Sequence, residues 1–183
     1  MTLAQVALKR HARFTVEQFH RLCDVVPEQR LELIDGEVLQ VIAKGTRHTA
    51  VVHRLSAVVQ SLLATEPAGG SLQLRVEAPL DLGPANEPEP DLALVMRRED
   101  DYWSAHPTAA QTALVIEVAD SSLAFDCEIK QRLYAAAGIQ RYWVIDVQQP
   151  RLLLLLEPTH GSPEPLLQRL RPVVEDMLLR LPG

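Results

Sequence analysis

Residues 113–120 read ALVIEVAD, a nearly continuous apolar run that is interrupted by one carboxylate, Glu117. A run of this length and composition predicts a buried β-strand, so we expect the Glu117 side chain to be largely withdrawn from water. An isolated buried carboxylate is costly, and Glu117 would then need a cation, a metal ion or a proton as its partner. The spacing equally allows an outward-facing Glu117 on a half-exposed strand, or a pair with a nearby arginine.

A second stretch, PEPDLALVM at residues 88–96, predicts a short strand that begins at Asp91, directly after Pro90. If this strand lies beside the strand of residues 113–120, Asp91 and Glu117 can converge on one hard cation. Mg²⁺ takes oxygen ligands and is commonly held by one or two carboxylates together with water and substrate phosphate. An aspartate at a strand start is common by itself, so the prediction of a metal site depends on the pair.

Outward from these two strands, the chain alternates between helical and strand patterns. Thr15 and Gln18 form a capping box for a short helix that ends before Pro27. Asp35-Gly36 separates two β-rich runs within residues 30–42, which predicts a tight hairpin. Further helices are expected at 48–64 and 125–137, the second closed by Gly138, and further strands at 71–82, 141–147 and 151–157. The tail after Pro163 is amphipathic and has no clear secondary structure.

These patterns predict a single α/β (α+β) domain over residues 1–183, with a mixed central β-sheet and helices at its faces. Hydrophobic residues make up 47 % of the chain, which is enough for a sizeable core. The two cysteines, Cys23 and Cys127, are too few and too far apart for a disulfide framework and favour a reducing compartment. No signal-peptide pattern and no membrane-length apolar run is found, so we expect a cytoplasmic protein.

The formal net charge of −6 argues against long duplex DNA as a partner, because nucleic-acid-binding proteins usually carry a basic surface. The basic residues are scattered along the chain. An acidic total still allows a local basic face, particularly if several carboxylates gather at a metal ion.

Several segments together resemble the Uma-type restriction endonuclease family of the PD-(D/E)XK nuclease superfamily. They are RLELIDGEV, RHTAVVHRL, PEPDLALV, LVIEVADSSLAFD, Lys130, Tyr134, Ala137-Gly138-Ile139 and RYWVID. The resemblance runs from about Thr15 to Asp146. It implies a restriction-endonuclease-like core, with Asp91 and Glu117 as metal-binding acids for Mg²⁺, which Mn²⁺ can replace.

The same resemblance implies roles for two further residues. The superfamily's basic residue two positions after the glutamate is replaced by Ala119, and Lys130 on the following helix would take over its role. On spacing alone, Lys130 would be an exposed helix lysine that pairs with Asp126. Glu32 is similar to an N-terminal glutamate that many such nucleases add to the metal site, and its alternative is a solvent-facing strand residue. His48, near a helix start, could contact phosphate, although a surface histidine is the simpler interpretation.

The function expected from these residues is metal-dependent phosphodiester hydrolysis, with nucleic acid, and DNA in particular, as substrate. Asp91 and Glu117 would hold the metal, with Glu32 as a further ligand, and Lys130 would position water or stabilise charge on the phosphate. The alternative is a non-catalytic interaction or nucleic-acid-binding module on the same fold, which could be a homodimer. The acidic net charge supports this alternative.

Overall fold

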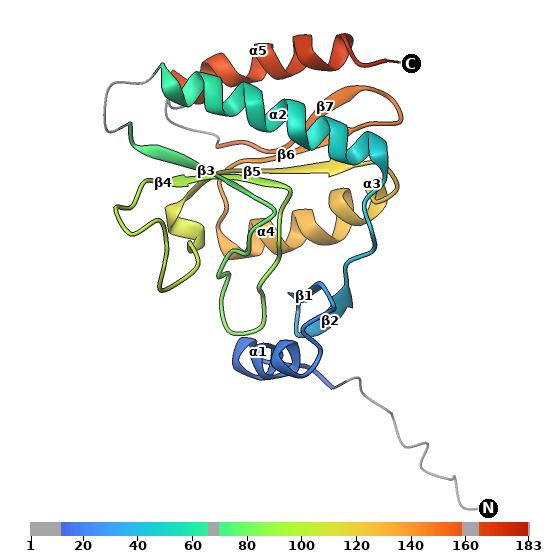
Figure 1. Cartoon of the computed structure of the whole chain (residues 1–183), viewed down its shortest axis with the longest axis vertical. Coiled ribbons are helices and arrows are strands. Elements are labelled where there is room, and N and C mark those ends of the chain that lie inside the picture. Colours follow the sequence, from blue (N-terminus) through green and yellow to red (C-terminus); the bar gives the residue numbers. More distant parts are fainter. Residues whose placement is uncertain (1–11, 66–69, 159–164, 183) are drawn as a thin grey trace, which may run out of the picture.

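A computed structural model describes residues 12–65, 70–158 and 165–182, and a five-stranded mixed sheet forms its centre (Figure 1). The strand order is β3 (Leu72–Val76), β4 (Leu92–Met96), β5 (Thr112–Ala119), β6 (Tyr142–Asp146) and β7 (Arg151–Leu156). β5 and β6 pair in parallel, and the other neighbours pair antiparallel. This arrangement confirms the predicted α+β architecture with a mixed central sheet.

Helices cover both faces of the sheet (Figure 1). α2 (Thr46–Ala64) and α5 (Pro165–Leu179) lie together on one face, and α4 (Gln131–Ala137) lies on the other. The apolar stripe predicted for residues 48–64 is buried against the sheet and α5, and its fully buried members are Val51, Val52, Leu55 and Val59. The tail that the sequence left unassigned therefore forms a helix because its apolar side can complete this core.

A smaller layer lies beyond α4 and consists of α1 (Val16–Val25) and the hairpin β1 (Leu31–Ile34) and β2 (Glu37–Gln40) (Figure 1). The predicted capping box of Thr15 and Gln18 is present at the start of α1. Asp35 and Gly36 make the predicted tight turn, and both have positive φ, at 51° and 74°. Two positive φ values in succession match the twist of the flanking strands, which favours the Asp-Gly pair.

The crossover from β5 to β6 contains the helix predicted over residues 125–137, and its first part is wider than an ordinary α-helix. It consists of α3 (Leu123–Phe125), a π-helical turn η2 (Asp126–Lys130) and then α4. Gly138, with φ of 86°, closes α4 as predicted. A short 3₁₀ turn, η1 (Ala109–Gln111), precedes β5.

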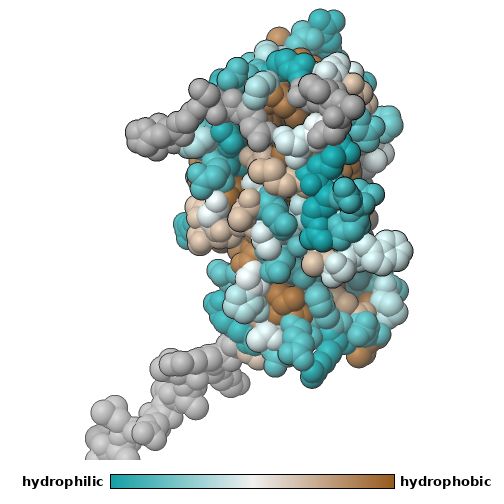
Figure 2. All heavy atoms as spheres, turned by 90° about the vertical axis from the view of Figure 1, so that its left-hand side faces the viewer, coloured by the Kyte–Doolittle hydropathy of each residue, from teal (hydrophilic) through white to brown (hydrophobic). Residues whose placement is uncertain are grey.

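Hydrophilic residues dominate the side of the molecule on the left of Figure 1, and hydrophobic residues reach that surface only in separate small patches (Figure 2). None of the helices within the described residues combines the length and the apolar character needed to cross a membrane.

Candidate metal centre and active site

The sheet register brings Asp91 and Glu117 together. Leu92 pairs with Ile116 in the antiparallel ladder of β4 and β5, so Asp91, one residue before β4, comes opposite Glu117. The main-chain N–H of Asp91 donates to Glu117 Oε2 at 3.4 Å, and the N–H of Val118 donates to Asp91 Oδ2 at 2.7 Å. Both side chains are buried, which excludes the outward-facing alternative for Glu117.

Lys130 lies inside the protein and contacts two of the predicted acids. Its side chain reaches Glu117 Oε1 at 2.8 Å and Glu32 Oε1 at 3.5 Å, and the residue is only 6 % exposed. It is therefore not the exposed helix lysine that spacing alone would favour. Glu32, predicted with a solvent-facing alternative, is buried as well. The structure thus gathers all four predicted site residues, Glu32, Asp91, Glu117 and Lys130, in one buried cluster.

The π-helical turn η2 positions Lys130 together with two other polar residues of the crossover. Asp126, at its start, is buried and accepts a hydrogen bond from Ser122 Oγ. Tyr134, one turn after Lys130, donates its hydroxyl to Glu117 Oε1 at 2.8 Å. A π turn adds one residue to the helical circuit and is frequently found at functional sites. Here Asp126, Lys130 and Tyr134 are all buried.

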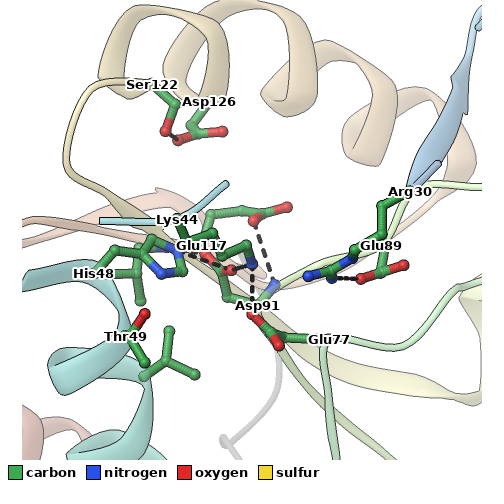
Figure 3. Close-up of polar contacts among 12 residues, drawn as sticks. Arg30, Lys44, His48, Thr49, Glu77, Glu89, Asp91, Glu117, Ser122 and Asp126 are labelled. Atoms are coloured by element: carbon green, nitrogen blue, oxygen red, sulfur yellow. Dashed lines mark hydrogen bonds and ion pairs between the residues drawn. The ribbon is translucent and has the colours of Figure 1, made fainter. Parts of the chain in front are cut away.

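On its other side, Asp91 contacts a second lysine and a histidine. Lys44 donates to Asp91 Oδ1 and, at 2.7 Å, to Glu77 Oε1. His48 Nε2 lies 3.0 Å from Asp91 Oδ1, and His48 is buried, so the interpretation as a surface histidine is wrong. Figure 3 shows Lys44 and His48 beside Asp91, with Glu77 below.

Sequence reasoning missed Lys44 and Glu77 and undervalued His48. Lys44 lies in a stretch without apolar periodicity, and no spacing rule relates it to an acid 47 residues later. His48 did carry a signal, because it stands three, four and seven residues before Val51, Val52 and Leu55 on the buried face of α2.

Burial and neighbouring charges act differently on the two central acids. Burial raises the pKa of Glu117 to about 8; Lys130 opposes this shift, while Asp91, Asp126 and Glu32 add to it. Burial also works against the charge of Asp91, but the hydrogen bond and charge of His48, together with Lys44, lower the pKa of Asp91 to about 2. Asp91 is therefore an anion at neutral pH, whereas burial favours the protonated form of Glu117 there in the absence of a bound cation.

The cluster opens into a cleft of about 460 Å³. Its lining contains six carboxylate side chains, two lysines and one histidine, namely Glu32, Glu89, Asp91, Glu117, Asp120, Asp126, Lys44, Lys130 and His48. Among the residues that the structure describes, no group of three or more His, Cys, Asp or Glu side chains converges in the arrangement of a ready-made metal cage. Instead, the ammonium group of Lys44 contacts Asp91 Oδ1, and that of Lys130 contacts Glu117 Oε1.

A family model described as "Putative restriction endonuclease", Uma2, matches residues 16–180. The chain belongs to the Uma2 family. No curated protein matches this Uma2 chain in sequence. Among solved structures, it is similar to a crystal structure described as a putative nuclease belonging to DUF820 from Anabaena variabilis ATCC 29413. The two chains share 17 % identity with a TM-score of 0.61, and the match covers 90 % of this chain and 99 % of the other. At this identity the likeness shows a common fold, and it extends over nearly the whole Uma2 chain.

Proposed function

We propose that the chain is a divalent-metal-dependent phosphodiester hydrolase, specifically a DNA endonuclease, that acts through Asp91, Glu117 and Lys130. The observation that supports this proposal most directly is the buried contact of Lys130 with Glu117, beside Asp91 on the neighbouring strand. Membership of a family described as restriction endonucleases supports nucleic acid as the substrate.

The chemistry of the cluster fits a hard divalent cation. Carboxylate oxygens are the ligands that Mg²⁺ prefers, and two of them with water and a substrate phosphate are sufficient. The cluster carries more acids than bases: four buried carboxylates (Glu32, Asp91, Glu117 and Asp126) face the two lysines, Lys44 and Lys130. The raised pKa of Glu117 reflects burial together with this excess of negative charge. A divalent cation would neutralise this excess charge and stabilise the ionised form of Glu117. Asp91, Glu117 and Glu32 would be its protein ligands, and Mn²⁺ could replace Mg²⁺.

When bound, such a cation supplies positive charge to the scissile phosphate and lowers the pKa of a water molecule. The main chain orients the two acids, and Lys130 supplies a further positive charge. Val118 N–H orients Asp91, and Asp91 N–H orients Glu117. Lys130, whose pKa is raised by the surrounding acids despite its burial, stays protonated and provides a fixed positive charge beside Glu117. A fixed charge at the position where negative charge develops on the phosphate stabilises the transition state.

A Mg²⁺ titration by calorimetry, followed by a DNA cleavage assay with Mg²⁺ and Mn²⁺, tests the proposal. Asp91→Asn and Glu117→Gln should each abolish metal binding and cleavage. Glu128→Gln is the matched control, because Glu128 is an exposed acid on η2 and lies outside the cleft lining. The metal site would be ruled out if the wild-type protein binds neither Mg²⁺ nor Mn²⁺. It would also be ruled out if the Asp91 and Glu117 variants bind Mg²⁺ as tightly as the wild type. Metal binding without cleavage of any DNA would favour the alternative, a non-catalytic binding module, which the net charge of −6 supports.

A further inference from the structure

A second pocket adjoins the 460 Å³ cleft that Asp91 and Glu117 line, the acid cleft. It has a volume of about 260 Å³ and lies between the first turns of α2, the turn between β6 and β7, and the end of the chain. Figure 1 shows these three segments at the same end of the molecule. Its lining residues are Thr46, Arg47, Ala50, Val51, Arg54, Val147, Gln148, Pro150, Leu181 and Pro182.

Two connections show that the two pockets are neighbours. Gly45 lines the acid cleft and the next residue, Thr46, lines the second pocket. Asp120 of the acid cleft also accepts a hydrogen bond, through its main-chain oxygen at 3.0 Å, from Gln148 Nε2 of the second pocket. The second pocket therefore lies beside the acid cleft, at the start of α2.

The charge of the second pocket is opposite to that of the acid cleft. Its charged lining residues are Arg47 and Arg54, and no carboxylate side chain lines it. Both arginines are exposed, and within the described part of the chain neither guanidinium group has a hydrogen-bond or ion-pair partner. The 19 residues of α2 include no Asp or Glu, although the whole chain has a net charge of −6. This pocket is thus a local basic face on an acidic protein.

The geometry of the two arginines suits a nucleic-acid backbone. They are seven residues apart, two helical turns, so they lie on one side of α2 and about 10 Å apart along its axis. Phosphates on one DNA strand advance about 3.4 Å per nucleotide along the duplex axis, so this span matches about three nucleotide steps. Between the arginines, Ala50 and Val51 with Val147, Pro150 and Leu181 give the pocket an apolar floor that can contact a sugar or a base.

We propose that this second pocket is a nucleic-acid-binding subsite, in which Arg47 and Arg54 contact phosphates of the strand that flanks the scissile phosphodiester. The inference rests on the proposed function, since it assumes that the acid cleft holds the scissile phosphate. It also resolves the conflict between an acidic chain and a polyanionic substrate. The acid cleft, with its excess of carboxylates, repels flanking phosphates, and the adjacent arginine pair attracts them.

The test measures binding and cleavage separately. Binding of a fluorescein-labelled DNA duplex, the corresponding single strand and an RNA strand is followed by fluorescence anisotropy in EDTA over a range of salt concentrations. Arg47→Ala and Arg54→Ala should each weaken binding about tenfold near physiological salt. Each should also reduce the slope of log K against log salt by about 0.7 to 0.9. Arg132→Ala is the matched control and should change neither quantity, because Arg132 is an exposed arginine on α4, on the opposite face of the sheet. Circular dichroism verifies that the variants remain folded.

The outcomes distinguish the inference from the proposed function. Mg²⁺-dependent cleavage by the wild type together with unchanged binding by the arginine variants would overturn the subsite and leave the nuclease proposal standing. Absence of cleavage together with the expected loss of binding would support the subsite on a non-catalytic protein. No binding of DNA or RNA by the wild type would overturn the subsite. Competition by polyglutamate as effective as that by nucleic acid would show a general polyanion surface and would also overturn it.

Discussion

Replacing Glu117 with glutamine in the metal-free protein should leave the folded state at least as stable near neutral pH, and the variant's advantage should grow with pH. Burial raises the pKa of Glu117 from an ordinary value of 4.5 to about 8, with Lys130 opposing the shift. The folded state therefore binds this proton more tightly than the unfolded state. The contribution is fully present below pH 4.5 and is lost as the pH rises through about 8. A glutamine at this position has no such proton to lose.

The size of the effect follows from the same shift. Wild-type stability should fall relative to the variant by about 1.4 kcal/mol per pH unit across that window, which amounts to roughly 3 kcal/mol at pH 7. The loss of a charged partner for Lys130 opposes this gain, and removing one member of a buried ion pair costs about 3–5 kcal/mol when the other stays charged. Lys130 keeps its contact with Glu32 at 3.5 Å, however, and Glu117 with its pKa of about 8 is largely protonated at pH 7. The expected net change at pH 7 is between zero and about 3 kcal/mol of stabilisation.

Urea denaturation in EDTA at several pH values from about pH 5 to about pH 9 measures this difference. Glu128→Gln serves as the control for the same replacement of a carboxylate by an amide, because Glu128 is exposed. A Glu117→Gln protein that is less stable by about 3 kcal/mol or more at pH 7 would refute the reasoning and identify a structural ion pair with Lys130. A stability difference that does not vary with pH would contradict the raised pKa.

Three further predictions concern other parts of the structure. Lys130→Ala should retain Mg²⁺ binding in calorimetry but lose cleavage by about a hundredfold or more, and Lys130→Arg should restore it poorly because a planar guanidinium is not a compact charge; full activity of either variant would remove Lys130 from the site. Leu55→Ala should destabilise the protein by about 2–5 kcal/mol in urea, because Leu55 is fully buried between α2 and the sheet, and a change below about 1 kcal/mol would contradict that packing. Asp91, with its pKa lowered to about 2, contributes stability that is present above pH 3.8 and is lost as the pH falls through 2. The free energy of unfolding of Asp91→Asn should therefore fall less steeply than that of the wild type between pH 3.8 and pH 2. An equally steep fall in both proteins would refute the cause given for the lowered pKa of Asp91.

The features that the sequence predicted are those in which local pattern and tertiary packing agree. The run at residues 113–120 is long and apolar enough to specify a buried strand, so a single charge within it stands out. Asp35-Gly36 specifies its turn because both residues tolerate positive φ. The predicted convergence of Asp91 and Glu117 depended on the two strands being neighbours in the sheet. The sequence allowed that arrangement without requiring it, and β4 and β5 do pair.

The features that sequence reasoning missed depend on contacts between distant segments. Lys44 lies between β2 and α2 and reaches Asp91 through a contact across 47 residues, and nothing in its local sequence indicates that contact. The π turn of η2 cannot be seen in a helical pattern, since the widening by one residue changes which side chains face inward without changing their type. The last helix needed a partner, α2, before its apolar side had a place to be buried.

In each of the two central acids, one carboxylate oxygen accepts a main-chain N–H of the neighbouring strand and the other accepts a lysine. Asp91 uses Oδ2 to accept the main-chain N–H of Val118, and Glu117 uses Oε2 to accept that of Asp91, so one oxygen of each is engaged with the neighbouring strand. The other oxygen of each accepts a lysine, Lys44 for Asp91 and Lys130 for Glu117. Exchanging a lysine contact for another cation would therefore leave the strand contacts intact. The sheet thus orients both acids without a bound ligand, and preorganisation of this kind would lower the cost of assembling the proposed metal site.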